Sequence, residues 1–174
     1  MLETELRHFR EAVIEVMQTM ANLEVHSNKV FEKHAAGWPR ADVSGNIGLV
    51  GDKVVGGFAL LFPRDAVLTI ASNMLYEEFT DITGDVSDCV GELCNIVCGG
   101  VKKRFAEETD IRFNLTQPTV IRGENHTQYH MVHHPVSVLP FDFDGKQFYL
   151  EAFLVDISGL ESETEIRKRV SSIS

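Results

Sequence analysis

Residues 43–63, VSGNIGLVGDKVVGGFALLFP, restrict the possible folds more than any other part of the chain. Two apolar runs meet at Gly51-Asp52-Lys53, a short Gly-bearing connection, and this pattern predicts a β-hairpin. Pro63 stops the second strand. The apolar face of such a hairpin has to be covered by other elements, because a sheet buries its face only against another layer.

Three segments have the three- and four-residue apolar spacing of amphipathic helices. The first covers residues 5–23, and the second covers residues 66–75 with Asp65 as its expected N-cap. The third runs for about twenty residues through Phe105, and its acidic start and basic end suit the helix dipole. Its candidate capping residues are Thr83, Asp85 and Ser87.

Three further segments have the composition of strands: residues 110–121, 134–143 and 147–157. Asp144-Gly145 predicts a hairpin turn between the last two. The polar tail from residue 161 to 174 is expected to be frayed. The order of elements predicts an α/β (α+β) fold in which a largely antiparallel sheet is backed by helices.

An internal similarity links the two halves of the chain. At a fixed offset Glu15 aligns with Glu92 and Gln18 with Asn95, and both halves end their aligned stretch on an apolar residue followed by proline. Neither half, residues 5–76 or residues 85–157, can bury a sheet face alone. We therefore expect one domain, residues 1–174, in which two half-repeats share a core.

Charge and composition narrow the classes of function. The chain has 174 residues, a formal net charge of −10 and 44% apolar residues, enough to build a core without disulfides or structural metals. The negative charge disfavours nucleic acid and anionic membranes, and favours a protein partner that is basic or bears lysines. The longest apolar run, residues 54–62, is too short to span a bilayer. The first residues lack the pattern of a signal peptide, so we expect a cytoplasmic protein with free thiols.

Two groups of residues resemble metal ligands, and we expect neither to bind metal. The three cysteines lack the paired spacing of a zinc site, and small buried thiols explain them better. The histidines in residues 124–135 are irregularly spaced beside a proline and are expected to lie in a polar loop, with zinc binding or proton sensing as the alternative. Trp38 is expected to pin a loop to the core. These residues are Cys89, Cys94 and Cys98, and His126, His130, His133 and His134.

The third predicted helix carries an unusual polar face. Asp88, Glu92, Asn95, Gly99 and Lys102 follow one another at steps of four, three, four and three residues, so they line one side. Asparagine and glycine are both unfavourable in a helix interior. Glycine lets another surface come close, and the Cβ atoms of Glu92 and Asn95 are about 5–6 Å apart and can reach one small target. The alternative is a solvated face with helix-packing glycines.

The spacing Asp88-x3-Glu92-x2-Asn95, followed by Pro118, resembles the signature of the CheC/CheX/FliY family of chemotaxis phosphatases. The stretch FREAVIEVMQTM and the order of elements resemble that family over most of the chain. CheC-like members carry Glu-x2-Asn in both halves, whereas CheX-like members keep only the second. Because the first half here has Glu15-x2-Gln18, the chain is most similar to CheX, and a residual first site is left open.

The resemblance implies hydrolysis of the aspartyl phosphate of a phosphorylated CheY-like response regulator. Asn95 is then expected to position the attacking water, and Glu92 to dock against a lysine of the regulator. Asp88 and Gly99 extend the partner-binding surface, and Pro118 edges a strand. No cofactor of its own is expected, because the Mg²⁺ belongs to the partner regulator. The resemblance also implies a homodimer.

Two other functions are open to the sequence. The first is a non-enzymatic adaptor or flagellar-switch component that binds a response regulator, since related folds occur in switch proteins. An adaptor has no need for both Glu92 and Asn95 on an exposed face and would not speed the loss of phosphate. The second is a ligand-sensing domain, for which the sequence has no positive signal.

Overall fold

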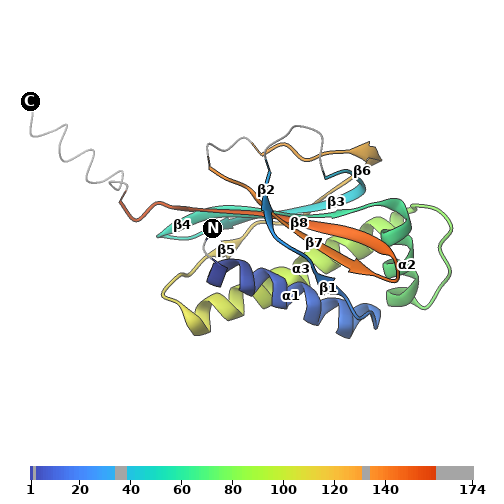
Figure 1. Cartoon of the computed structure of the whole chain (residues 1–174), viewed down its shortest axis with the longest axis horizontal. Coiled ribbons are helices and arrows are strands. Elements are labelled where there is room, and N and C mark those ends of the chain that lie inside the picture. Colours follow the sequence, from blue (N-terminus) through green and yellow to red (C-terminus); the bar gives the residue numbers. More distant parts are fainter. Residues whose placement is uncertain (2, 34–38, 131–133, 160–174) are drawn as a thin grey trace, which may run out of the picture.

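The hairpin predicted from residues 43–63 forms the middle of one antiparallel sheet, and three helices cover one face of that sheet within the described residues (Figure 1). The structure is a computed structural model that describes residues 1, 3–33, 39–130 and 134–159. Its elements in chain order are α1 Glu3–Ala21, β1 His26–Ser27, β2 Phe31–Glu32, β3 Ala41–Val50, β4 Val54–Phe62, α2 Arg64–Leu75, α3 Gly84–Glu108, β5 Asn114–Leu115, β6 Thr119–His126, β7 Ser137–Phe143 and β8 Lys146–Asp156.

The sheet has the order β1-β7-β8-β4-β3-β5, with β2 also paired to β7 and β6 also paired to β3. β3 and β4 are joined by the predicted turn, and β7 and β8 are joined at Asp144-Gly145. Both turn residues have positive φ, 46° at Asp144 and 73° at Gly145, as a two-residue hairpin turn requires. The two predicted hairpins and the helix-backed antiparallel sheet are confirmed.

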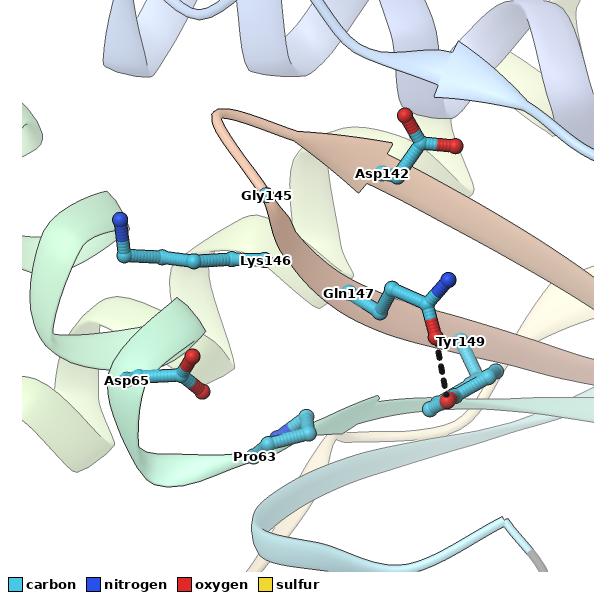
Figure 2. A pocket seen from close by; sticks show the side chains of 7 residues that line it. All are labelled: Pro63, Asp65, Asp142, Gly145, Lys146, Gln147 and Tyr149. Atoms are coloured by element: carbon cyan, nitrogen blue, oxygen red, sulfur yellow. Dashed lines mark hydrogen bonds between the residues drawn. The ribbon is translucent and has the colours of Figure 1, made fainter.

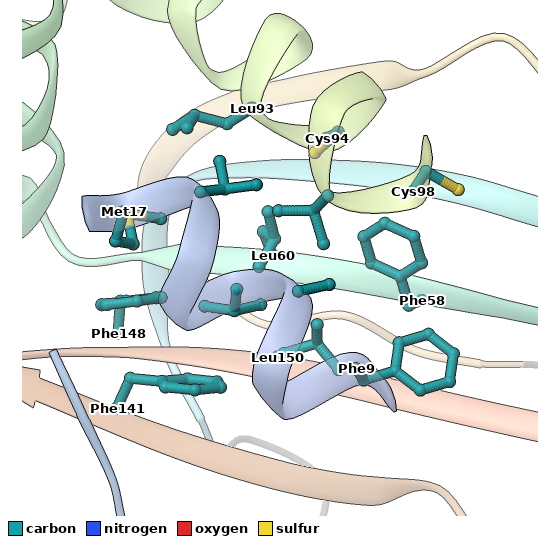
Figure 3. Packing of buried hydrophobic residues seen from close by; sticks show 14 of the residues in the cluster. Phe9, Met17, Phe58, Leu60, Leu93, Cys94, Cys98, Phe141, Phe148 and Leu150 are labelled. Carbon is teal, nitrogen blue, oxygen red and sulfur yellow. The ribbon is translucent and has the colours of Figure 1, made fainter. Parts of the chain in front are cut away.

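Aromatic and aliphatic side chains fill the space between the helices and the sheet. Figure 3 shows Phe9 of α1 lying over Phe58 of β4, with their ring centroids 5.9 Å apart. Phe148 of β8 stacks between Phe62 of β4 and Phe141 of β7, with centroid separations of 5.3 and 5.1 Å. All five rings are buried. This dense layer fixes the helices on the sheet.

The helices begin and end close to the predicted positions, with one error in capping. Pro63 is the N-cap of α2, and its own side chain offers no acceptor for the free N–H groups of the first turn. Asp65 lies inside the first turn instead, where its carboxylate accepts the N–H of Ala66. The prediction of Asp65 as the cap was therefore wrong. Asp42 of β3 accepts the N–H of Arg64 at 2.8 Å, so an acceptor distant in the sequence serves this end of the helix.

The predicted third helix is α3, which has 25 residues and is longer than expected. Of the three candidate caps, Thr83 is the N-cap, and its side chain accepts from the N–H of Val86. None of the helices among the described residues is long and apolar enough to cross a membrane.

The region after α3 differs most from the prediction. The strand expected over residues 110–121 is two strands, β5 and β6, separated by residues 116–118. Pro118 comes directly before β6, as expected for a residue at a strand edge. β6 continues to His126, which the sequence placed in a polar loop. That prediction was wrong because β6 is an edge strand with mostly exposed residues, so it lacks the apolar alternation that marks a strand.

Two predictions fall outside the described residues, Trp38 and the tail beyond residue 160. The short strands β1 and β2 were not predicted. The division of one domain into two half-repeats stays a prediction.

Candidate functional site

The predicted polar face of α3 points away from the core. Asp88, Glu92, Asn95, Gly99 and Lys102 are all exposed. The opposite side of α3 is buried against the sheet and α1 and includes Val90, Leu93, Cys94, Val97 and Val101. The sequence therefore placed these five polar-face residues on the correct side of the helix.

The Glu92 and Asn95 side chains are open to an incoming partner. Among the described residues, neither side chain makes a hydrogen bond or an ion pair. An exposed carboxylate and an exposed amide that lie one helical turn apart are free to contact the same group on another molecule.

Neighbouring elements flank this face of α3 on both sides. On the β6 side, a Cβ added to Gly91 would lie 3.5 Å from Cγ2 of Val120. On the α1 side, a Cβ added to Gly100 would lie 3.3 Å from Cβ of Ala12. A Cβ added to Gly99 would meet nothing within 4 Å. Gly100 therefore serves the packing of α1, whereas no contact within the described chain requires glycine at position 99.

The cysteines of α3 form part of the core behind the polar face, as Figure 3 shows for Cys94 and Cys98. Burial raises the pKa of both thiols to about 12. Burial, and then the nearby Asp88 and Glu92 carboxylates, raise the pKa of Cys89. All three thiols are thus neutral at physiological pH and lack the thiolate character of a reactive cysteine.

The equivalent pair on α1 has a different environment. Arg104 of α3 donates to the Glu15 carboxylate at 2.5 Å and also contacts Glu11. The hydrogen bond and the charge of Arg104 lower the pKa of Glu15. Gln18 is exposed. The carboxylate of the first pair therefore ties α1 to α3, which the carboxylate of Glu92 does not do.

The histidine segment forms partly buried polar contacts on the sheet face away from the helices. The His126 ring contacts the Ser44 hydroxyl at 2.8 Å. His130 lies 2.7 Å from the fully buried Glu151 carboxylate, which also accepts from Lys33 at 2.6 Å. The sequence missed this acidic partner because Glu151 is distant in the chain. His134 is exposed, and His133 lies outside the described residues.

No group of three or more metal-ligating side chains occurs in the part of the chain that the structure describes. The buried carboxylate of Glu151 instead forms an ion pair with Lys33, and the ring of His130 lies within hydrogen-bond distance of its other oxygen.

Three hollows on the described surface have neither Glu92 nor Asn95 in their lining. One of about 520 Å³ lies at the β7–β8 turn beside the start of α2. Figure 2 shows its charged groups, Asp65, Asp142 and Lys146, and the hydrogen bond that Tyr149 donates to Gln147. This lining mixes both charge signs.

Two further hollows lie at the ends of α3. One of about 450 Å³ is lined by Arg64, Asp81 and Arg122, near the start of the helix. The other, about 400 Å³, is lined by Lys102 and Arg112 near its end. Neither is lined by Glu92 or Asn95, so the pair stands on the open helix surface between them.

Comparison with known sequences gives the family. The sequence profile of the chemotaxis phosphatase CheX matches residues 43–142, which is more than half of the chain. The protein belongs to the CheX family. The matched region includes α3 with Asp88, Glu92, Asn95 and Gly99. The predicted membership of the CheC/CheX/FliY family, with the greatest similarity to CheX, is confirmed. A search of curated proteins found no match.

Solved structures agree with this family. A CheC-like superfamily protein from Shewanella sp. PV-4 is 32% identical with a TM-score of 0.84, over 89% of this chain and 99% of that chain. The chemotaxis protein CheX from Vibrio vulnificus is 32% identical with a TM-score of 0.82, over 87% of this chain and 99% of that chain.

A more distant fold relative is CheX in a CheX–CheY–BeF3–Mg²⁺ complex from Borrelia burgdorferi. It is 24% identical with a TM-score of 0.73, over 87% of this chain and 98% of that chain.

Proposed function

We propose that this protein hydrolyses the aspartyl phosphate of a CheY-like response regulator. The observation that carries the proposal is the Glu92 and Asn95 pair, exposed and without partners among the described residues, on a helix within the region matched by the CheX family. The complex of the Borrelia relative with CheY supports a regulator as partner.

Asn95 is the catalytic residue of this proposal. An acyl phosphate is already reactive and passes through a loose transition state, so catalysis consists mainly of placing a water in line with the bond that breaks. The Asn95 carbonyl oxygen accepts a hydrogen bond from that water, while its NH2 group donates one to a phosphoryl oxygen. A neutral amide suits this position because a carboxylate would be repelled by the phosphoryl anion.

Glu92 and Asp88 act in docking. A carboxylate is poorly suited to face the phosphoryl group, so Glu92 pairs with a lysine of the regulator and orients the docked helix. Asp88, one turn earlier and also exposed, extends the same acidic contact. The Mg²⁺ is held by the regulator and not by this chain.

Gly99 completes the docking surface on the other side of Asn95. Apart from its own turn of the helix, no atom of the described chain lies within 4 Å of where its Cβ would be. The regulator therefore approaches the backbone of α3 closely at this turn.

On the family resemblance alone we also propose that the protein forms a homodimer. Sedimentation equilibrium tests this proposal.

Loading CheY-like receiver domains with phosphate and following its decay tests the proposal. The wild-type protein should hasten the decay. Asn95→Ala should abolish turnover while binding to the receiver is kept, and Glu92→Ala should weaken docking and turnover together. Glu107→Ala, at another exposed glutamate of α3, is the matched control and should behave as wild type.

Two outcomes would contradict the proposal. If Asn95→Ala hastens decay as well as wild type does, the amide has no catalytic role. If the wild-type protein binds the phosphorylated receiver but leaves its decay unchanged, the protein is an adaptor of the response regulator and not a phosphatase.

A further inference from the structure

The turn of α3 that presents Glu92 and Asn95 rests on β3 at a glycine. Cys94 directly precedes Asn95, is fully buried and points at Gly45. A Cβ added to Gly45 would lie 2.3 Å from the Cys94 sulfur and 3.1 Å from Cγ1 of Val90. Real Cβ atoms do not come within such a distance of sulfur, so a side chain at position 45 requires α3 or its side chains to move.

The surroundings leave little room for that movement. Cys94, Val90 and Leu93 are fully buried and belong to one buried cluster with side chains of the sheet. Figure 3 shows Cys94 and Leu93 within this cluster. On the α1 side, a Cβ added to Gly100 would lie only 3.3 Å from Cβ of Ala12, so α1 packs closely there. Because a packed core passes a displacement on rather than absorbing it, a side chain at position 45 would lift or rotate this part of α3.

We propose that Gly45 is a positioning residue for the reaction proposed above, because by admitting the Cys94 side chain it sets the height and rotation of the α3 turn that carries Glu92 and Asn95. The inference rests on the proposed function. Cys94 acts only by its size, since its thiol is buried and neutral.

The effect should appear in turnover more than in binding. Docking uses several exposed groups along α3, whereas catalysis needs the amide of Asn95 in line with one bond. A displacement of about 1 Å far from the reacting atoms can cost about 100-fold in rate. A shift of the α3 turn therefore lowers kcat more than it raises KM.

The test measures kcat and KM for decay of a phosphorylated receiver. Gly45→Ala is expected to lower kcat about tenfold or more and to change KM by less than about twofold. Adding Cys94→Ala, which removes the sulfur that the new Cβ meets, should return kcat to the level of Cys94→Ala alone.

Gly48→Ala is the matched control. Gly48 lies on the same strand but on the opposite face of the sheet, where its Cβ would lie 2.9 Å from Cγ2 of Thr116. It should lower stability without lowering kcat. If Gly45→Ala does not fold, Cys94→Val takes its place, because it adds bulk to the same contact from the helix side and should also lower kcat.

A second readout is independent of catalysis. The backbone amide NMR signals of Glu92 and Asn95 should shift in Gly45→Ala and remain in place in Gly48→Ala. If wild type hastens decay but folded Gly45→Ala keeps its kcat, or if Cys94→Ala fails to rescue it, the inference is wrong. If wild type leaves decay unchanged, the proposed function fails instead, and unmoved amide signals in Gly45→Ala would overturn the positioning claim by themselves.

Discussion

Two pairs of residues in this molecule share one spacing and differ in their surroundings. Glu15 and Gln18 lie on α1, and Glu92 and Asn95 lie on α3, each pair on an exposed helix surface. Arg104 engages the carboxylate of Glu15, whereas Glu92 has no side-chain partner among the described residues. The same i, i+3 spacing thus serves helix packing in one half and leaves a free acid and amide in the other. Spacing identifies a candidate, and the contacts of the carboxylate separate the two roles.

The largest expected effect tests whether the α1 pair can replace the α3 pair. Asn95→Ala should lower turnover of a phosphorylated receiver by about 100-fold or more, as loss of a transition-state hydrogen bond does elsewhere. Adding Gln18→Asn, which recreates the Glu-x2-Asn spacing on α1, should restore nothing because Arg104 holds Glu15. Phosphate decay with the single and double variants measures this. Recovery in the double variant would mean that the two pairs are equivalent sites.

Alanine substitutions at Gly99 and Gly100, two adjacent glycines of α3, should have effects of intermediate size. Gly99→Ala should raise the free energy of unfolding by about 0.5–1 kcal/mol, because alanine favours the helix and its Cβ meets nothing within 4 Å. The same change should weaken receiver binding. Gly100→Ala should give little or no gain in stability, because its Cβ would press on Ala12, and should leave binding unchanged. Denaturant unfolding and receiver titration check both; equal binding by wild type and Gly99→Ala would remove Gly99 from the docking surface.

The smallest effect concerns the ion pair of Glu15. Because Arg104 lowers the pKa of Glu15 below its ordinary value of 4.5, this pair stabilises the folded state above that pH and loses its effect as pH falls through the lowered pKa. The Glu15 carboxylate is exposed, so Glu15→Gln should cost only about 0.2–1 kcal/mol at neutral pH and less in high salt. Urea unfolding of wild type and Glu15→Gln at neutral and acidic pH measures this. A difference that persists in strong acid would show that the ion pair is not its source.

The sequence predicted the main helices and the two hairpins because apolar period and turn residues are local signals. It also placed Asp88, Glu92, Asn95 and Gly99 on one exposed face, since helix geometry follows from spacing. Features made by distant residues were missed. The contact of Cys94 with Gly45 and the ion pair of Arg104 with Glu15 depend on how β3, α1 and α3 pack together. A local sequence pattern does not predict such contacts between distant elements.

The error in β6 has a related cause. Its residues are mostly exposed at the edge of the sheet, so pairing with β3, rather than an apolar pattern, holds the strand. His126 was assigned to a loop for that reason. His130 was read without its acidic partner because Glu151 comes from β8.

The most direct test of the account replaces Asn95 by aspartate, which keeps the shape and exchanges the NH2 donor for a charged oxygen. The measurement is the first-order decay rate of a phosphorylated receiver at saturating protein, with wild type and Asn95→Asp side by side. We expect turnover to fall to the level of Asn95→Ala, because a carboxylate cannot donate to the phosphoryl oxygens and repels them. Decay as fast as with the wild-type protein would show that a base, and not a neutral amide, performs the reaction.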